Sequence, residues 1–157
     1  MSSHKKTKKI LFTSHVASFQ KFNRPFMRMM SEKGWEVHYA SMGEEEILDC
    51  DKSFVVPFTR SPFSLSNITA YRQLKKIINQ ENYDIIHTHT PMGSVVTRLA
   101  AKKARKNGTK IIYTAHGFHF FKGAPLLNWL IYYPVERLMA RHTDTLITIN
   151  KEDYCRA

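Results

Sequence analysis

The chain has 157 residues, 43% of them hydrophobic, and its 24 Lys and Arg against 13 Asp and Glu give a formal net charge of +11. This length suits one domain with a real core, and the composition excludes a disordered chain. The apolar run after the basic N-terminus is too short for a signal peptide, and no run is long enough to span a bilayer. Cys50 and Cys155 lie far apart, without disulfide or metal spacing, which favours a reducing compartment. We therefore expect a cytoplasmic protein, soluble or peripheral on a membrane, with an anionic partner.

Short β-branched or aromatic runs alternate with helix-length segments along the whole chain. Strands are expected at residues 9–13, 35–40, 54–58, 84–87, 110–115 and 144–150. The third is edge-like, because Pro57 cannot donate to a ladder. Helices are expected at 22–33, from Asn67 through Ile78, at 91–107 and at 125–141, and residues 151–154 begin another. Asn67 is the expected cap of the second helix, and Thr90 with Pro91 that of the third.

This alternation predicts the fold class and the domain organisation. Strands that alternate with helices form a parallel sheet with helices on both faces. We therefore expect an α/β, Rossmann-like, three-layer domain with a mainly parallel sheet. It should cover residues 9–157 and follow a basic tail at residues 1–8.

Two neighbouring strands end in histidine and a turn residue. The fourth runs into His87, His89 and Thr90, and the fifth runs into His116 and Gly117. In an open parallel sheet, ligands bind outside the carboxyl ends of the strands, so this edge is the expected site. An alternative for His87 is a buried, hydrogen-bonded position at the strand end.

The first strand ends in polar residues that could bind a ligand through hydroxyl and backbone groups, namely Ser14, His15 and Ser18. The chain contains no Gly-x-Gly-x-x-Gly, no Gly-x-x-x-x-Gly-Lys-Ser/Thr and no Gly-x-Ser-x-Gly motif. The usual dinucleotide, nucleoside-triphosphate and serine-hydrolase signatures are therefore missing.

His116 is the strongest candidate for chemistry. Gly117 behind it lets the backbone approach a ligand, and a neutral imidazole can exchange a hydrogen bond with a sugar hydroxyl or act as a base. The alternative is a packed turn histidine. The aromatic residues that follow, Phe118, Phe120 and Phe121, are expected to divide between the core and an exposed loop.

His87, His89, His116 and His119 could in principle form a metal cluster. No cysteine accompanies them and Asp84 is the one obvious carboxylate nearby, so we expect no metal.

The helix at 125–141 combines three aromatic residues, Trp129, Tyr132 and Tyr133, with Arg137 and Arg141. This composition suits a membrane interface. The favoured alternative is burial against the sheet and a further domain.

Several segments together resemble the N-terminal half of a family-4 glycosyltransferase, in the bacterial capsular and exopolysaccharide branch. The matching segments are residues 10–15, 22–26, 34–38, 84–93, 113–120, 122–129 and 148–154. The His-Gly-Phe at 116–118 and the Gly-Ala-Pro-Leu-Leu-Asn-Trp at 123–129 are the most specific. The resemblance covers nearly the whole chain after the basic tail.

The resemblance implies a two-domain GT-B enzyme of capsular polysaccharide and exopolysaccharide biosynthesis. Such enzymes move a sugar from a nucleotide-sugar donor, usually UDP-linked, with retention of configuration and without a metal or other cofactor. The acceptor is commonly an undecaprenyl-diphosphate-linked saccharide at the inner face of the cell membrane, which implies peripheral contact with an anionic membrane. The N-terminal domain of the family mainly holds the acceptor.

The resemblance also implies roles for individual residues. The histidine matching His116 reaches the donor sugar, so His116 is the expected catalytic residue. The remaining candidates are expected to bind substrate, near the phosphates or along the cleft: Ser14, His15, Ser18, His87, His89, Thr90, Gly117 and Phe118.

The chain departs from the family pattern in one respect. The C-terminal donor-binding domain, with its pair of glutamates and its basic residues, is absent, and charge on the leaving diphosphate would need those groups. We therefore expect this chain alone to be inactive and its partner to be such a domain. An alternative function is a non-catalytic binding module for an anionic or lipid-linked saccharide. A nucleic-acid binder is disfavoured, because no motif for reading bases is present.

Overall fold

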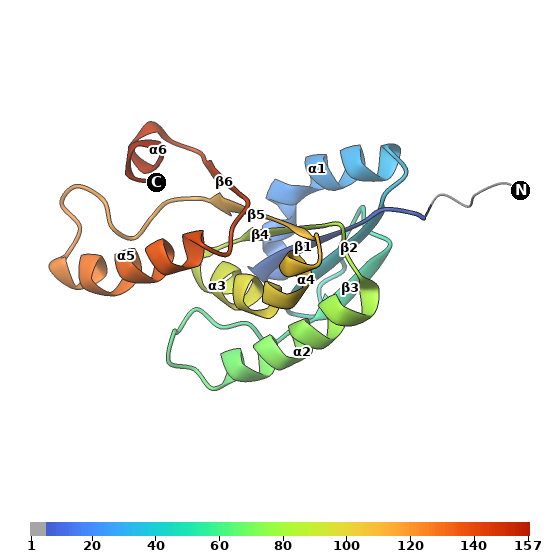
Figure 1. Ribbon diagram of the computed structural model, residues 1–157, viewed down its shortest axis with the longest axis horizontal. Helices are drawn as coiled ribbons and strands as arrows, with labels where there is room; N and C mark the ends of the chain where they lie inside the picture. The colour runs from blue at the N-terminus through green and yellow to red at the C-terminus, as the bar shows by residue number, and fades with distance from the viewer. Residues whose placement is uncertain (1–5) are drawn as a thin grey trace, which may run out of the picture.

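The computed structural model describes residues 6–157 and forms one parallel six-stranded sheet in the order β3-β2-β1-β4-β5-β6 (Figure 1). The strands are β1 (Lys9–Val16), β2 (Glu36–Met42), β3 (Lys52–Val55), β4 (Ile85–His89), β5 (Lys110–Ala115) and β6 (Thr145–Thr148). The α-helices are α1 (Gln20–Glu32), α2 (Ser66–Glu81), α3 (Pro91–Ala100), α4 (Lys102–Lys106), α5 (Leu126–Ala140) and α6 (Lys151–Arg156). The 3-10 helix η1 (Ala17–Phe19) joins β1 to α1. Most of the expected basic tail, residues 1–5, lies outside the described part.

The order of the strands reverses at the centre of the sheet, which is where open α/β sheets form a ligand crevice. The chain leaves β1 through α1 toward β2, whereas it leaves β4 through α3 toward β5. These connections run in opposite directions from two adjacent strands, so β1 and β4 mark the point where a ligand binds in open α/β sheets. The expected Rossmann-like, parallel, three-layer fold is confirmed.

Two hydrophobic clusters hold helices on the two faces of the sheet, as Figure 1 shows for α1 on one side and α2 and α3 on the other. Side chains alternate along a strand. Leu11 therefore packs with Leu74 of α2, whereas Phe12 packs with Met27 of α1. The main chain of the sheet is thus covered on both faces, as parallel sheets require.

An ion pair ties α3 to α5. Arg98 is only 1% exposed, and its Nη2 donates to Glu136 Oε2 at 2.9 Å. The guanidinium also lies over the ring of Tyr113, 4.3 Å from the centroid. Two charges removed from water in this way depend on each other for compensation.

Three local expectations are wrong. The third strand is β3 (Lys52–Val55) and not 54–58; the Val56 N–H still donates to the Ser41 carbonyl of β2, and the side chains of Val56 and Phe58 are buried in the cluster under α2. Asn67 does not cap α2, because its Oδ1 accepts from the Thr59 backbone and its Nδ2 donates to the Ser61 carbonyl. The helix expected at 91–107 is divided into α3 and α4.

Helices α1 and α5 both leave large apolar side chains exposed, contrary to the burial expected for α5. In α1 the buried face is Asn23, Met27 and Met30, while Phe22 and Phe26 are exposed. In α5 only Met139 is buried, so this helix is not enclosed against the sheet. Among residues 6–157, no helix combines the length and the apolar character needed to cross a membrane.

Candidate functional site

Three imidazole rings meet at the carboxyl ends of β4 and β5. His87 and His89 are two residues apart in β4 and share a face, with ring centroids 4.3 Å apart. His116 follows β5, and its Nε2 lies 3.1 Å from Nδ1 of His89, within hydrogen-bond distance. His87 Nε2 in turn lies 2.8 Å from the Thr114 hydroxyl. The parallel pairing of the strands therefore brings the predicted histidines together.

Aromatic residues from the connection after β1 cover this histidine cluster (His87, His89 and His116). Phe19 meets His116 edge-on, with centroids 4.8 Å apart, and Phe22 lies 5.7 Å from the same ring. The sequence reasoning did not identify Phe19 as part of the site. It lies in a one-turn 3-10 helix, where no periodic pattern marks its side chain.

Burial keeps these imidazoles neutral. Burial, with a smaller effect of His116, lowers the pKa of His87 to about 4. Burial, aided by the two neighbouring imidazoles, lowers the pKa of His89 to about 2. His116 is only half-buried, and burial lowers its pKa from the usual 6.5. All three rings are therefore uncharged at neutral pH, and each can donate one hydrogen bond and accept one.

A second group of residues joins β1 to the start of α3. Thr90 occupies the expected N-cap position of α3, ahead of Pro91, but its side chain makes no capping bond; its Oγ1 accepts from the backbone N–H of His15 at 3.2 Å. Gly93 makes this approach possible, because a Cβ there would lie 2.7 Å from Thr90 Oγ1 and 3.2 Å from the His15 nitrogen. Arg60 Nε donates to His15 Nε2 at 2.8 Å. No local pattern marks Arg60, which lies 45 positions along the chain from its partner.

Thr90 has a strained backbone. Its φ of +65° and ψ of 141° lie in a region that β-branched residues rarely adopt. Such conformations cost on the order of 1–3 kcal/mol and cluster at functional sites. This backbone conformation lets the chain turn sharply from β4 into α3.

The other predicted substrate-binding residues differ in accessibility. Ser14 is fully buried and its hydroxyl bonds to the Val16 carbonyl and to Tyr39, so it supports the fold and does not face the crevice. Phe118 is also buried, stacked on Phe120. Ser18 is exposed, and Gly117, with φ of +137°, has open space around its α-carbon. The expected division of the phenylalanines holds, because Phe121 is 45% exposed.

His119 does not join the histidine cluster. It is exposed, and its ring packs against Tyr132 at 4.6 Å between centroids. The four-histidine arrangement considered from the sequence is therefore not formed.

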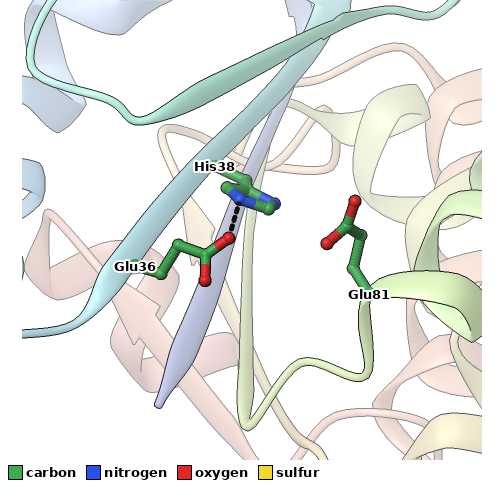
Figure 2. A group of neighbouring side chains, drawn as sticks. All are labelled: Glu36, His38 and Glu81. Atoms are coloured by element: carbon green, nitrogen blue, oxygen red, sulfur yellow. Dashed lines mark hydrogen bonds and ion pairs between the residues drawn. The ribbon is translucent and has the colours of Figure 1, made fainter. Parts of the chain in front are cut away.

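One group of side chains within residues 6–157 is spaced to hold a metal ion, and it lies at the amino end of the sheet. Glu36, His38 and Glu81 place ligand atoms within 4.8 Å of one another (Figure 2). However, Lys9 Nζ lies 3.0 Å from both carboxylates and already balances them. The Lys52 and Lys9 ammonium groups lower the pKa of Glu81 to about 2. We interpret this group as an ion-pair network.

Comparison with known proteins agrees with this architecture. Residues 9–150 match the family described as Glycosyl transferase 4-like. The chain is 54% identical over 152 residues to "Putative glycosyltransferase EpsD" of Bacillus subtilis, covering 96% of this chain and 40% of that protein. It is 30% identical over 106 residues to UDP-Gal:alpha-D-GlcNAc-diphosphoundecaprenol alpha-1,3-galactosyltransferase of Escherichia coli, covering 67% of this chain and 27% of that protein. The chain thus spans well under half the length of these relatives.

Solved structures share the fold at low sequence identity. Staphylococcus aureus MnaA, solved with UDP, superimposes with a TM-score of 0.63 at 17% identity, over 93% of this chain and 39% of that one. Acinetobacter baumannii MurG superimposes with a TM-score of 0.58 at 9% identity, over 92% and 42%. With its strand order, its crevice and a family match over residues 9–150, the chain belongs to the Glycosyl transferase 4-like family.

Proposed function

We propose that this chain is the acceptor-side domain of a retaining glycosyltransferase that moves a sugar from a UDP-sugar to an undecaprenyl-diphosphate-linked saccharide in capsule or exopolysaccharide synthesis. The observation that carries this proposal is the cluster of His87, His89 and His116 at the β1–β4 crevice. The printed name of the Escherichia coli relative, which includes a UDP-linked donor and a diphosphoundecaprenol acceptor, supports both substrate classes.

In this proposal different residues of the crevice bind the donor and the acceptor. His116, half-buried at the strand end, contacts the donor sugar. The exposed Arg60 guanidinium, beside His15, faces the acceptor diphosphate, where a positive charge suits phosphate oxygens. The reaction requires no metal, because the charge on the leaving diphosphate is neutralised by basic groups of the donor-binding domain.

The described residues form one Rossmann-like sheet. The chain covers 40% of the Bacillus subtilis relative, and no carboxylate hydrogen-bonds to the histidine cluster within residues 6–157. We therefore propose that the isolated chain binds acceptor without transferring sugar, and that a C-terminal domain completes the enzyme.

Peripheral contact with the inner face of the cell membrane fits the surface at the start of α5. Leu126, Leu127 and Leu130 are 74%, 64% and 65% exposed, and Phe121 and Lys122 precede them on the surface. Apolar side chains beside basic ones favour the interface of an anionic bilayer. The positive charge should make binding to phosphatidylglycerol vesicles stronger than to phosphatidylcholine vesicles, and Leu126→Ser with Leu127→Ser should abolish binding by removing the inserted apolar groups. Equal binding to both vesicles, or none, would remove the membrane from the proposal.

A chimera tests the enzyme assignment. This chain replaces the matching 40% of the Bacillus subtilis relative. The purified chimera is given radiolabelled UDP-glucose, UDP-galactose or UDP-N-acetylglucosamine with an undecaprenyl-diphosphate-linked N-acetylglucosamine acceptor. Label should enter the lipid fraction with at least one donor, and the isolated chain should transfer none.

Matched variants test the role of His116 in the same assay. His116→Ala in the chimera should reduce transfer by on the order of 100-fold, the loss expected when one hydrogen bond to a reacting group is removed. His119→Ala removes a histidine of the same loop that lies outside the cluster and should leave transfer unchanged. Acceptor binding by a folded chimera that transfers nothing from any donor would favour the non-catalytic binding module instead.

A further inference from the structure

The tautomers of His89 and His116 depend on each other. A neutral imidazole carries one N–H and one bare nitrogen. The 3.1 Å contact between His89 Nδ1 and His116 Nε2 therefore needs a donor on one side and an acceptor on the other. Either His89 donates from Nδ1, or His116 donates from Nε2.

The far side of His89 distinguishes these two arrangements. Its Nε2 is buried and has no hydrogen-bond partner among the described residues. If His89 accepted at Nδ1, its proton would be on Nε2, and a buried N–H would be left unpaired. Orphaned buried N–H groups are rarer in folded proteins than buried acceptors that lack a partner. If His89 donates from Nδ1, the buried atom without a partner is the unprotonated Nε2, and no N–H group is left unpaired.

The position of the proton on His116 then follows. Its Nε2 accepts from His89, so its single proton lies on Nδ1. Nδ1 has no partner among the described residues, and it is not one of the buried unpaired atoms, so it reaches the surface at the strand end. Phe19, edge-on against the ring, helps to hold this orientation.

We propose that His89 is a positioning residue that fixes His116 as the tautomer protonated on Nδ1, so that His116 offers the crevice an N–H donor and not a base. The ligand of that donor rests on the proposed function: a sugar hydroxyl or ring oxygen can accept from it. The tautomer itself is a property of the chain without bound ligand. General-base catalysis by the exposed nitrogen of His116 is excluded in this arrangement, because that nitrogen already holds the proton.

The test is a two-bond ¹H–¹⁵N correlation spectrum of the 157-residue chain labelled with ¹⁵N-histidine at neutral pH, which separates protonated from bare ring nitrogens. His116 should show a protonated Nδ1 and a bare Nε2, and His89 likewise. In His89→Phe, which keeps a ring but removes the donor, His116 should shift toward the Nε2–H tautomer that a free imidazole favours in water. His89→Asn, whose amide can donate from nearly the same place, should preserve the original pattern.

His119→Phe is the matched control, because it removes a histidine of the same loop outside the cluster and should leave His116 unchanged. A bare Nδ1 on His116 in the unsubstituted chain would overturn the proposal, and this readout does not depend on whether any variant folds. An unchanged His116 in a folded His89→Phe chain would overturn it too. The spectra are recorded without ligand, so a chimera without transferase activity would refute the proposed function and leave this result standing.

Discussion

Replacing Gly93 with alanine sets helix propensity against packing. In an isolated helix the change would stabilise by up to about 1 kcal/mol. Here the new Cβ would lie 2.7 Å from Thr90 Oγ1 and 3.2 Å from the His15 backbone nitrogen. Thr90 can turn its hydroxyl away only by losing the His15 N–H, a bond worth about 1 kcal/mol. The backbone contact remains, and overpacking costs about 1–3 kcal/mol. We therefore expect a net loss of about 1–3 kcal/mol in the free energy of unfolding.

Urea unfolding followed by far-UV circular dichroism measures this loss as a lower midpoint at constant slope. Thr90→Ala is the matched variant, because it removes the clashing oxygen. The double variant Thr90→Ala with Gly93→Ala should lose less stability than the sum of the single variants, since the two residues are in direct contact. A Gly93→Ala chain as stable as the unsubstituted one would refute the close packing of α3 on the end of β1.

Three further changes have expected outcomes. Arg98→Met should lower the free energy of unfolding by about 3–5 kcal/mol, because it leaves the Glu136 carboxylate uncompensated, and adding Glu136→Gln should recover part of that loss in urea unfolding. The pKa of Glu81, lowered to about 2 by Lys52 and Lys9, means that its stabilisation is complete above the ordinary value of 4.5 and is lost as pH falls toward about 2. Glu81→Gln should therefore reduce the loss of stability between about pH 6 and about pH 3, and an unchanged pH profile would contradict the network. EDTA should leave transfer by the chimera unchanged; lost activity restored by a divalent cation would contradict the metal-independent mechanism.

The architecture was predictable because each strand is a local β-branched run and each connection is of helix length. The exceptions depend on long-range contacts. Val56 and Phe58 have the composition of strand residues, yet β3 ends at Val55 and their side chains fill the core under α2. Asn67 has the composition of a helix cap, but its amide holds the loop at Thr59 and Ser61. Local rules fail where a distant partner offers the same group a better hydrogen bond.

The sequence was enough to predict that the histidines gather at one sheet edge, but not the contacts that they make there. Parallel strands necessarily bring His89 and His116 to the same edge, so their proximity followed from the sequence. The direct contact between the rings, and the burial that keeps them neutral, depend on how the β1–α1 connection closes over them. Ser14 was chosen for its hydroxyl, but alternation along β1 turns that side chain into the interior toward Tyr39. Arg60 reaches His15 from a loop, which no periodic pattern describes.

The ion-pair network of Lys9, Glu36 and Glu81 lies at the opposite end of the strands from the histidine cluster. The stabilising ion pairs and the histidine cluster are thus separated by the length of the strands. Selection for tolerance of acid or heat can act on one end without disturbing ligand geometry at the other. A library restricted to the amino-end charges offers a way to adjust the stability of this domain while the geometry of the histidine cluster stays fixed.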